Sequence, residues 1–480
     1  MNLENNSVLI KWLKNYWLLL VLPIAYLLLI SPYITGRIST NNHNLIITLT
    51  TIENWLEDGA LAHSFNLINS WGNPGDLGVH YYPRVMSEEG RNYFVSYPPL
   101  SFIVFYGVVN IFQPSNFIVA FKLFGVLIHL FSFCVLFYII KNKSNLWIAY
   151  LLGGVFLFFP SSIVLSLMYY PEQLIILLLL LLVVVFEFSS SKGQYFLLLI
   201  LSFMLVYCDW LGVLIIGSML FFNLFISEEK LWKVSLFLVL GGSLGGLLLL
   251  FQYSNISGFE ALVQGLKVRY IERSGVFSEF YSDRGVNLYS SNTLSYLFSH
   301  LVPTIIGGLI AVCFLIVKKG LNFKYRWIWL VIVPILVHMI VLFNSNIIHF
   351  QNLAKLSLVF SLGVAFWIGK KTIKPVVVIA ILSINIFFSV YFVTQYFDQY
   401  SSSSEVYDKA DFIRENNDLK ASIVLEQEGF SEDLVLLSYL TKRNLTWQKD
   451  STSAFLNKSK YSGKIVFLGW PHRNLVIIPN

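Results

Sequence analysis

Long apolar runs, separated by short polar segments, dominate the chain. Residues 174–186 and 234–251 contain no charged side chain. At about 1.5 Å per residue, such runs provide most or all of a helix that crosses a hydrocarbon core of roughly 30 Å. The first run, residues 17–30, follows Lys11 and Lys14 without a small-residue cleavage site, which favours an uncleaved crossing over a removed signal peptide. The pattern predicts a polytopic membrane protein.

Basic residues cluster between the apolar runs and predict the orientation of the chain. With these clusters in the cytoplasm, Lys11 and Lys14 hold the N-terminus inside, and the polar segments 35–97 and 253–292 become large outer loops. We expect a multi-pass protein of a bacterial inner membrane. The clusters are Lys141 with Lys143, Lys192, Lys230 with Lys233, residues 318–326 and residues 370–374, and the shorter outer loops are residues 169–173, 208–210 and 343–352.

One apolar segment breaks this alternation. Residues 98–112 have both flanks outside and begin with two prolines, and at about fifteen residues the segment is short for a crossing. We interpret it as a juxtamembrane or re-entrant helix. About eleven crossings then remain, and the C-terminus lies outside.

The tail of the chain, residues 399–480, is less apolar and mixes two periodicities. The predicted fold is therefore an all-α polytopic membrane domain, residues 1–398, followed by a small α/β domain on the outer face. The elements expected in the tail are helices at 401–417 and 433–441 and strands at 421–426 and 464–468.

The composition agrees with lipid as the main solvent. Hydrophobic residues make up 56% of the chain and charged residues 12%, whereas soluble domains carry about 25% charged residues. The net charge of +6 lies in the loop clusters, so it indicates topology and contact with membrane lipids, and we expect no nucleic-acid partner. Cys134, Cys208 and Cys313 lie in or beside apolar runs, which implies no disulfide framework.

The first outer loop opens with a predicted helix, residues 45–58, that carries two acids four residues apart, Glu53 and Glu57. His43 stands at the start of this helix, where a base or a ligand would meet a helix N-terminus. The alternative is an amphipathic helix that lies on the membrane with solvated acids. Its apolar face would consist of Leu45, Leu49, Ile52 and Leu56.

The rest of this loop is dense in glycine, proline and aromatic residues, which indicates an ordered segment rather than a linker. Aromatic faces suit the packing of sugars or prenyl chains, so Tyr82 and Tyr97 are candidates for substrate binding. An interfacial aromatic belt would explain the same residues. The segments concerned are residues 71–76, 80–84 and 93–100.

Charged residues at the outer ends of the crossings are the other candidates. Glu172 and Asp209 can act as a base or hold a metal, or they can be acids favoured by a helix N-terminus. Lys122 and Lys355 lie within apolar segments, where they would bind a lipid phosphate or snorkel to the headgroups. Two lone histidines in apolar segments, His129 and His338, are expected to pack. The remaining basic residues on the outer side are Lys267, Arg269, Arg273, Arg284 and His349.

Two landmarks resemble the GT-C superfamily of integral-membrane glycosyltransferases, especially its protein mannosyltransferase and aminoarabinose transferase branch. Glu57-Asp58-Gly59 is similar to the end of the first-loop helix in that family. Tyr97-Pro98-Pro99-Leu100 is similar to the segment before its juxtamembrane helix. Ile348-His349-Phe350 and the α/β tail are similar as well, although less specifically.

The resemblance implies transfer of a sugar from a polyprenyl-phosphate carrier to a lipid, glycan or protein acceptor on the outer face. An acid just before the first-loop helix usually acts as the base, and cationic residues stabilise the departing phosphate. Here the matching position is His43-Asn44, and no Asp or Glu lies between Glu4 and Glu53. The chain departs from the family pattern at the residue that matters most for chemistry.

Three explanations of this departure stand. His43 is the base, since an imidazole titrates near neutral pH. Alternatively another acid replaces the missing one, with Asp58, Glu172 and Asp76 as candidates. In the third explanation the protein binds a lipid-linked sugar without transferring it.

The expected function is thus a lipid-linked-sugar glycosyltransferase, with Lys122, Arg269, Arg273, His349 and Lys355 around the donor phosphate. A transporter would be favoured by internal repeats, which we do not find. A glycan polymerase or ligase usually has its large loop later in the chain. A divalent metal would find ligands in His43, His80 and Glu172, although their spacing is not diagnostic.

Overall fold

The computed structural model describes residues 17–35, 43–68, 70–71, 85–86, 92–95, 97–188, 193–227, 232–274, 327–342, 345–346, 350–368, 373–400, 404–415, 422–426, 432–443, 445–448, 465–469 and 474–478. The chain divides into two compact units, each assembled from separate stretches of sequence. The first unit combines Met1–Gly36, Phe121–Gly245 and Glu272–Tyr396, and the second combines Arg37–Ala120, Gly246–Ile271 and Phe397–Asn480.

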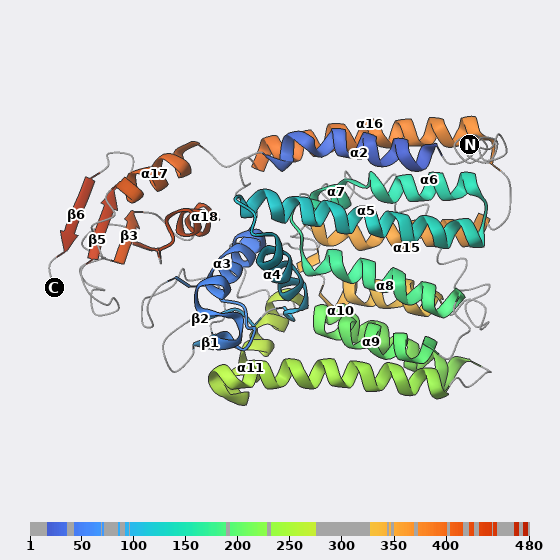
Figure 1. Cartoon of the computed structure of the whole chain (residues 1–480), viewed down its shortest axis with the longest axis horizontal. Coiled ribbons are helices and arrows are strands. Elements are labelled where there is room, and N and C mark those ends of the chain that lie inside the picture. The colour runs from blue at the N-terminus through green and yellow to red at the C-terminus, as the bar shows by residue number, and fades with distance from the viewer. Residues whose placement is uncertain are drawn as a thin grey trace, which may run out of the picture. The chain divides into compact units, whose positions relative to one another are not determined.

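The first unit is a bundle of apolar helices. In an apolar solvent every backbone N–H and C=O needs an internal partner, and a helix provides one within its own segment. The axes of the long helices lie nearly parallel to one another (Figure 1). Those described in this unit are α2 (Leu18–Ile34), α5 (Phe117–Lys143), α6 (Leu146–Leu157), α7 (Pro160–Ser166), α8 (Pro171–Phe188), α9 (Gly193–Cys208), α10 (Trp210–Phe221), the π-helical turns η2 (Phe222–Ile226) and η5 (Ile328–Ile332), α13 (Val333–Val341), the 3-10 turn η6 (Phe350–Leu353), α15 (Ala354–Ile368) and α16 (Pro375–Tyr400), while α11 (Trp232–Ser274) runs through both units.

Among the described residues, four helices are long and apolar enough to cross a membrane. The bent pair α6 and α7, with 60° between its halves, makes a fifth if it counts as one span. Five further apolar helices are shorter, including α2, α9 and α4 (Leu100–Phe112). The polytopic helical class is confirmed. The number of crossings, about eleven by charge and hydropathy, stays a prediction, as does the juxtamembrane placement of α4.

Ser166, at the end of α7, is a meeting point of three helices in the first unit. The Tyr26 hydroxyl of α2 donates a hydrogen bond to Ser166 Oγ over 2.5 Å. On α5, Gly125 lies so close to the Ser166 carbonyl oxygen that a Cβ at this position would fall inside van der Waals distance. The Gln173 side chain of α8 also donates to the Gly125 carbonyl. A glycine is therefore required where α5 crosses this junction.

Replacing Gly125 with alanine is expected to destabilise the protein. The added methyl group forces α5 away from α7, and overpacking of this kind costs about 1–3 kcal/mol. The apparent melting temperature in detergent should fall. Gly107→Ala on α4 is the matched control, because a Cβ there meets nothing within 4 Å. Equal melting temperatures for the two variants would contradict the close approach.

The second unit contains the first outer loop. It consists of α3 (His43–Asp58), the 3-10 helix η1 (Ala60–His63), a small antiparallel pair of β1 (Val85–Met86) with β2 (Asn92–Tyr93), and α4. Asn66 ties this loop together, because its carbonyl accepts a hydrogen bond from Trp55 Nε1 over 3.1 Å and its side chain donates to the Gln252 carbonyl over 3.0 Å. The predicted first-loop helix is confirmed, and hydrogen bonds order the loop.

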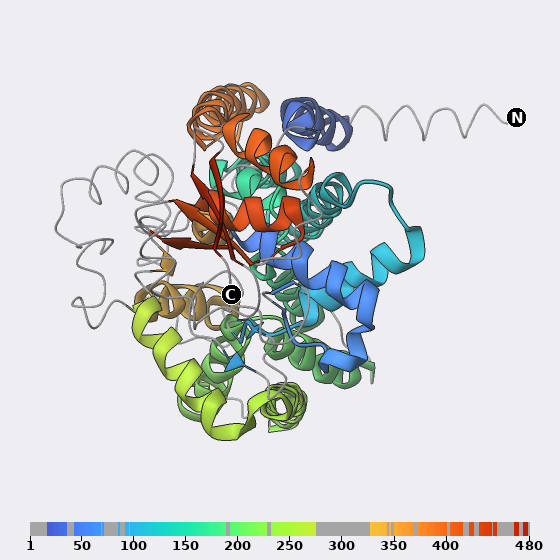
Figure 2. The same cartoon turned by 90° about the vertical axis from the view of Figure 1, so that its left-hand side faces the viewer.

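A four-stranded sheet in the order β4-β3-β5-β6 forms the C-terminal part of the second unit. The strand β3 pairs in parallel with β4 and β5, and β6 closes one edge antiparallel to β5. Two helices, α17 (Ser404–Glu415) and α18 (Glu432–Thr441), lie beside the strands (Figure 2). The strands are β3 (Ser422–Glu426), β4 (Leu445–Gln448), β5 (Ile465–Gly469) and β6 (Asn474–Ile478). The hydropathy pattern predicts α17, α18, β3 and β5, but it misses the short strands β4 and β6.

Glu53 holds α18 against α3. The Tyr439 hydroxyl donates to Glu53 Oε1 over 2.8 Å, and Lys442 forms an ion pair with Oε2. The Lys442 ammonium also lies 5.9 Å from the centre of the Trp71 ring. Burial, together with the Glu53 carboxylate, raises the pKa of the Tyr439 phenol, which therefore stays a donor. The alternative of a solvated acid is wrong for Glu53, which is only 6% exposed, whereas Glu57 is exposed.

Tyr439→Phe is expected to loosen α18. The substitution removes the donor to a buried carboxylate oxygen, and an unsatisfied buried acceptor costs about 1–3 kcal/mol. Hydrogen exchange measured by mass spectrometry should show faster exchange of the amides of α18 and β4. Tyr270→Phe, at a half-exposed position of the same unit, is the control and should leave exchange unchanged. Unchanged protection in both variants would show that Glu53 is not what holds this helix.

Candidate functional site: a buried polar cluster

Two acids stand at adjacent helix starts in the first unit. Glu172 is in the first turn of α8, directly after Pro171, a residue that suits the first position of a helix. Asp209 is the N-cap of α10, and its Oδ1 accepts a hydrogen bond from the Leu211 N–H over 2.7 Å. Each acid is 3% exposed. Local helix-start chemistry therefore explains the position of both carboxyl groups, but not their burial.

The ends of α8 and α9 bring these acids close together. The Cys208 thiol, which precedes Asp209, lies 3.6 Å from the Pro171 carbonyl oxygen and donates to it. Glu172 and Asp209 interact electrostatically with each other, and both interact with the positive charges of Lys355 and Arg273. Two buried acids thus lie within electrostatic reach of two basic residues, and the opposite charges compensate one another.

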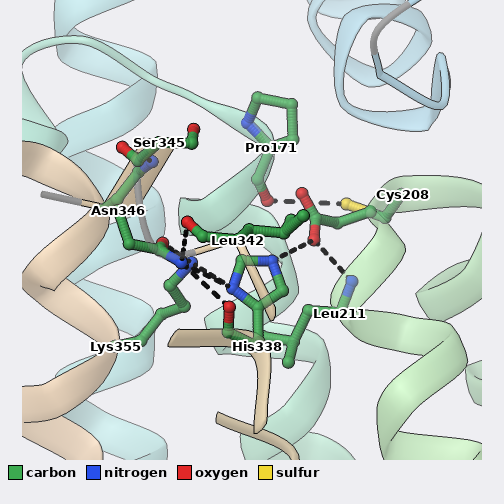
Figure 3. Close-up of polar contacts among 10 residues, drawn as sticks. Pro171, Cys208, Leu211, His338, Leu342, Ser345, Asn346 and Lys355 are labelled. Atoms are coloured by element: carbon green, nitrogen blue, oxygen red, sulfur yellow. Dashed lines mark hydrogen bonds and ion pairs between the residues drawn. The ribbon is translucent and has the colours of Figure 1, made fainter. Parts of the chain in front are cut away.

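Lys355 of α15 and His338 of α13 complete the cluster. The Lys355 Nζ lies 3.2 Å from His338 Nδ1 and 3.2 Å from Asn346 Oδ1. On the other side of the ring, His338 Nε2 lies 4.0 Å from Asp209 Oδ1. Figure 3 shows the ring between the Lys355 side chain and the start of α10 at Leu211. An ammonium group only donates, so Nδ1 accepts and the proton of a neutral ring points to Asp209.

Asn346 positions both basic groups. Its Nδ2 donates to the carbonyl oxygens of His338 over 3.0 Å and of Leu342 over 2.9 Å, which also accept from the backbone N–H groups of Leu342 and Asn346 at the end of α13. Its Oδ1 accepts from Lys355. Asn346 is fully buried. The amide therefore fixes the Lys355 ammonium relative to the His338 ring.

Glu172 differs from the rest of the cluster in one respect. Its Oε2 atom is buried and has no hydrogen-bond partner among the described residues. Asp209, by contrast, caps a helix and faces His338. Glu172 is thus the carboxyl group with a free acceptor atom, and Asp209, His338 and Lys355 are the polar residues of the cluster around it.

The structure brings together only some of the residues that the sequence singled out. Glu172 and Lys355 meet in the cluster, and Arg273 lies within electrostatic reach. The packing interpretation of His338 is wrong, because both of its ring nitrogens face polar partners. Among the predicted site residues, His349, Tyr82 and Asp76, and with them the proposed ligand His80, lie outside the described residues, as do the side chains of His43 and Arg269.

Lys122 has a structural contact of its own. It is buried in α5, and its Nζ donates to the Tyr33 carbonyl oxygen over 2.8 Å, in the last turn of α2. A cation at a helix C-terminus satisfies carbonyl groups and interacts favourably with the helix dipole. This contact lies inside the first unit and does not correspond to snorkelling.

Asp58 and Tyr97 belong to the second unit. The Asp58 carboxylate lies 3.3 Å from His63 Nε2, and the opposite ring nitrogen of His63 lies 3.0 Å from the Tyr93 hydroxyl. The Tyr97 carbonyl accepts a hydrogen bond from Tyr253. These contacts connect η1, β2 and α11 to the ends of α3 and α4. They give both residues a role in ordering the first loop.

Among the described residues, no three His, Cys, Asp or Glu side chains lie close enough together to hold a metal ion. In the buried cluster, the Lys355 ammonium occupies the place beside His338 Nδ1 that a metal would need. A cation of the protein itself therefore balances the acids there.

Asn346 is the residue of the cluster that sequence reasoning missed, whereas Asp209 was among its candidates. Asparagine carries no charge signal, and its place near the end of an apolar segment reads as an ordinary loop residue. The spacing along the chain gives a usable signal. Asn346 lies in the short outer loop 343–352, eight residues after His338 and nine before Lys355, which flank this loop. Polar residues on both sides of such a loop are placed to meet.

Comparison with solved structures finds a similar fold in two proteins. ArnT from Cupriavidus metallidurans, bound to undecaprenyl phosphate, has a TM-score of 0.63 and 10% identity, with 95% of this chain and 93% of that chain covered. The Archaeoglobus fulgidus oligosaccharyltransferase, tethered to an acceptor peptide, has a TM-score of 0.61 and 13% identity, with 95% and 69% covered. Both belong to the GT-C superfamily. No family model and no curated protein sequence matches the chain.

The chain has the GT-C fold. At this level of identity the likeness concerns the fold alone. The resemblance suggested by Tyr97-Pro98-Pro99-Leu100 and the first-loop helix is therefore confirmed as a statement about architecture. The predicted orientation of the chain places the buried cluster at helix ends on the outer side, which stays a prediction.

Lys355→Met is expected to destabilise the GT-C bundle. Removing one partner of a buried ion pair costs about 3–5 kcal/mol, because the acids lose their compensating charge. Adding Asp209→Asn should recover part of this loss, since residues of one electrostatic network couple by about 0.5–3 kcal/mol. The apparent melting temperatures of the wild type, both single variants and the double variant test this. Strictly additive losses would contradict the electrostatic coupling.

Proposed function

We propose that the protein is a glycosyltransferase that moves a sugar from a polyprenyl-phosphate-linked donor to an acceptor on the outer face of the membrane. The observation that carries this proposal is the buried pair of acids with Lys355 and Arg273, set in a GT-C fold. The fold is also that of a protein bound to undecaprenyl phosphate, which supports a lipid-phosphate donor for this chain.

The proposal assigns the missing first-loop acid to Glu172. Its free Oε2 atom suits the uptake of a proton from an acceptor hydroxyl group. As that proton leaves, the acceptor oxygen forms a bond to C1 of the sugar, and the bond from C1 to the phosphate oxygen breaks. Among the other candidates, Asp58 is engaged with His63, whereas His43 and Asp76 stay predictions.

Basic residues of the cluster would stabilise the leaving group. The donor is a phosphate diester with one negative charge, and polyprenyl phosphate leaves with two. Lys355 and Arg273 supply positive charge beside Glu172, where burial makes electrostatic stabilisation effective. The wider set proposed around the phosphate includes Arg269 and His349, and Tyr82 and Tyr97 would pack against sugar or prenyl groups.

The proposal names the acceptor only by its chemical class and includes no step that depends on a metal ion. The Archaeoglobus fulgidus oligosaccharyltransferase has an acceptor peptide in one structure and Zn with sulfate in another. For this chain we propose an acceptor of the lipid, glycan or peptide class. A divalent ion would need ligands beyond the buried cluster, so we route no step through a metal.

Glu172→Gln tests the proposal. The substitution keeps the shape of the side chain but removes the base, and transfer in purified protein should fall by about 10²-fold or more. The assay follows release of radiolabelled sugar from undecaprenyl-phosphate-linked mannose, glucose or aminoarabinose, with a membrane lipid extract as the acceptor. Glu187→Gln, near the other end of α8, is the control, because Glu187 pairs with Lys143 away from the cluster.

Two outcomes would change the proposal. Full activity of Glu172→Gln, with loss of activity in His43→Ala or Asp58→Ala, moves the base to the first loop. A wild-type protein that consumes no donor, yet binds undecaprenyl phosphate, contradicts transfer. That result would support a protein that binds lipid-linked sugars without catalysis, which the missing first-loop acid favours.

A further inference from the structure

The Lys355 ammonium group is held by two uncharged side chains. Its Nζ atom lies 3.2 Å from His338 Nδ1 and 3.2 Å from Asn346 Oδ1 (Figure 3). An ammonium group has three N–H donors, so these two contacts leave one N–H without a partner among the described residues. Lys355 is only 1% exposed, so the remaining donor is buried. A buried donor of this kind suits the oxygen atom of a ligand.

Asn346 presents its oxygen atom to Lys355 because of the contacts on its other side. Its Nδ2 atom faces the carbonyl oxygens of His338 and Leu342 over 3.0 Å and 2.9 Å, and a carbonyl oxygen can only accept a hydrogen bond. The amide nitrogen therefore belongs on the side of these carbonyls, and Oδ1 belongs on the side of the ammonium group. The reverse orientation would place oxygen against oxygen at the end of α13 and nitrogen against nitrogen at Lys355.

The same arrangement keeps the His338 ring neutral. Its Nδ1 atom faces the Lys355 ammonium group and lies 3.4 Å from Asn346 Nδ2, and both of these groups are donors. A proton on Nδ1 would point at another donor, so this atom accepts and the single proton of the ring is on Nε2. His338, Asn346 and Lys355 thus form a closed triangle in which the ammonium group carries the only charge.

Lys143 shows the more usual partner of a lysine. It pairs directly with the Glu187 carboxylate. Lys355 interacts electrostatically with Glu172 and Asp209, yet among the described residues neither acid pairs directly with its Nζ atom. A carboxylate in direct contact cancels much of the field of an ammonium group, and an incoming anion has to compete with it. Neutral acceptors orient the ammonium group without cancelling its charge.

We propose that His338 and Asn346 are positioning residues, which hold the Lys355 ammonium group so that its charge and one N–H remain available to a phosphate oxygen of the lipid-linked donor. This inference rests on the proposed function for the identity of that donor. Polyprenyl phosphate gains a negative charge as the sugar leaves, and a positive charge that is already fixed in place stabilises it without rearrangement.

A purely structural role for these partners makes a different prediction. If they serve only the stability of the bundle, a hydrogen-bond acceptor of either charge suffices at position 338, and phosphate binding does not depend on which one is present. If they keep the ammonium charge available, a neutral acceptor preserves phosphate binding and a charged acceptor of the same shape weakens it. His338→Asn and His338→Asp supply this pair, because the side-chain oxygen of each takes about the place of Nδ1.

The test measures binding of undecaprenyl phosphate and of undecaprenol to the wild type and both variants in detergent, by quenching of tryptophan fluorescence. The two lipids differ only in the phosphate, so the ratio of their affinities reports the phosphate contact. We expect His338→Asn to keep this ratio within about 3-fold, because its oxygen still accepts from Lys355. His338→Asp should lower the ratio by about 10-fold or more, because its carboxylate opposes the phosphate at close range.

His129→Asn is the control for these substitutions. His129 is a buried histidine of the same unit, and its ring nitrogen is bonded to the Leu157 carbonyl oxygen. The variant should keep the wild-type ratio of affinities. A fall in this ratio as large as that in His338→Asp would show a general effect of losing a buried histidine, and would overturn the inference.

The remaining outcomes also decide the inference. Equal ratios in His338→Asn and His338→Asp, or a wild type that binds both lipids alike, overturn it. If His338→Asp does not fold, nitrogen NMR of the wild type labelled at histidine replaces it, with the His338 signal identified by its loss in His338→Asn. We expect Nδ1 to be unprotonated with and without undecaprenyl phosphate, and a protonated Nδ1 overturns the inference.

Sugar transfer measured on the same preparations separates this inference from the proposed function. An active wild type, together with equal ratios in the two variants, overturns the positioning role alone. A wild type that consumes no donor, but shows the expected ratios, overturns the proposed transfer and supports the phosphate contact of Lys355.

Discussion

The constraint on which the site depends is the free energy of placing charge in apolar surroundings. Glu172, Asp209 and Lys355 are almost completely buried among apolar helices. None of them would stay charged there alone, because burial of an unpaired charge is unfavourable by several kcal/mol. Each charge is tolerated because a charge of the opposite sign lies near it, so removal of one charged residue destabilises the others. A site of this kind gains electrostatic strength from the same low dielectric that makes it hard to build.

Helix ends supply the remaining interactions. Asp209 accepts a hydrogen bond from a free N–H group at the start of α10, and Glu172 stands in the first turn of α8. Asn346 donates to carbonyl oxygens at the end of α13. Backbone groups that lack partners within a helix are thus turned to functional use. Chemistry gathers at the ends of the helices because only there does the backbone offer fixed partial charges of both signs.

In the second unit, two acids that the sequence offered as candidates for chemistry make structural contacts. Glu53 is bonded to Tyr439 and Lys442, nearly four hundred positions later in the chain. Asp58 similarly faces His63 and, through it, Tyr93. Their carboxyl groups are used in holding the first loop and the C-terminal helix in order. For this reason the acid that is absent before α3 is better sought in the first unit.

The sequence by itself determined the membrane class, the first-loop helix and most elements of the tail, because hydrophobic periodicity and helix-start signals are local. The GT-C architecture was expected only from the resemblance of Glu57-Asp58-Gly59 and Tyr97-Pro98-Pro99-Leu100 to that superfamily. The sequence also named Glu172 and Lys355, since charge in an apolar segment is conspicuous. Tertiary structure alone decided that His338 has polar partners, that Asn346 joins it to Lys355, and that Lys122 caps α2. Those contacts join residues on different helices, and helical periodicity indicates which face a residue occupies but not which helix lies opposite.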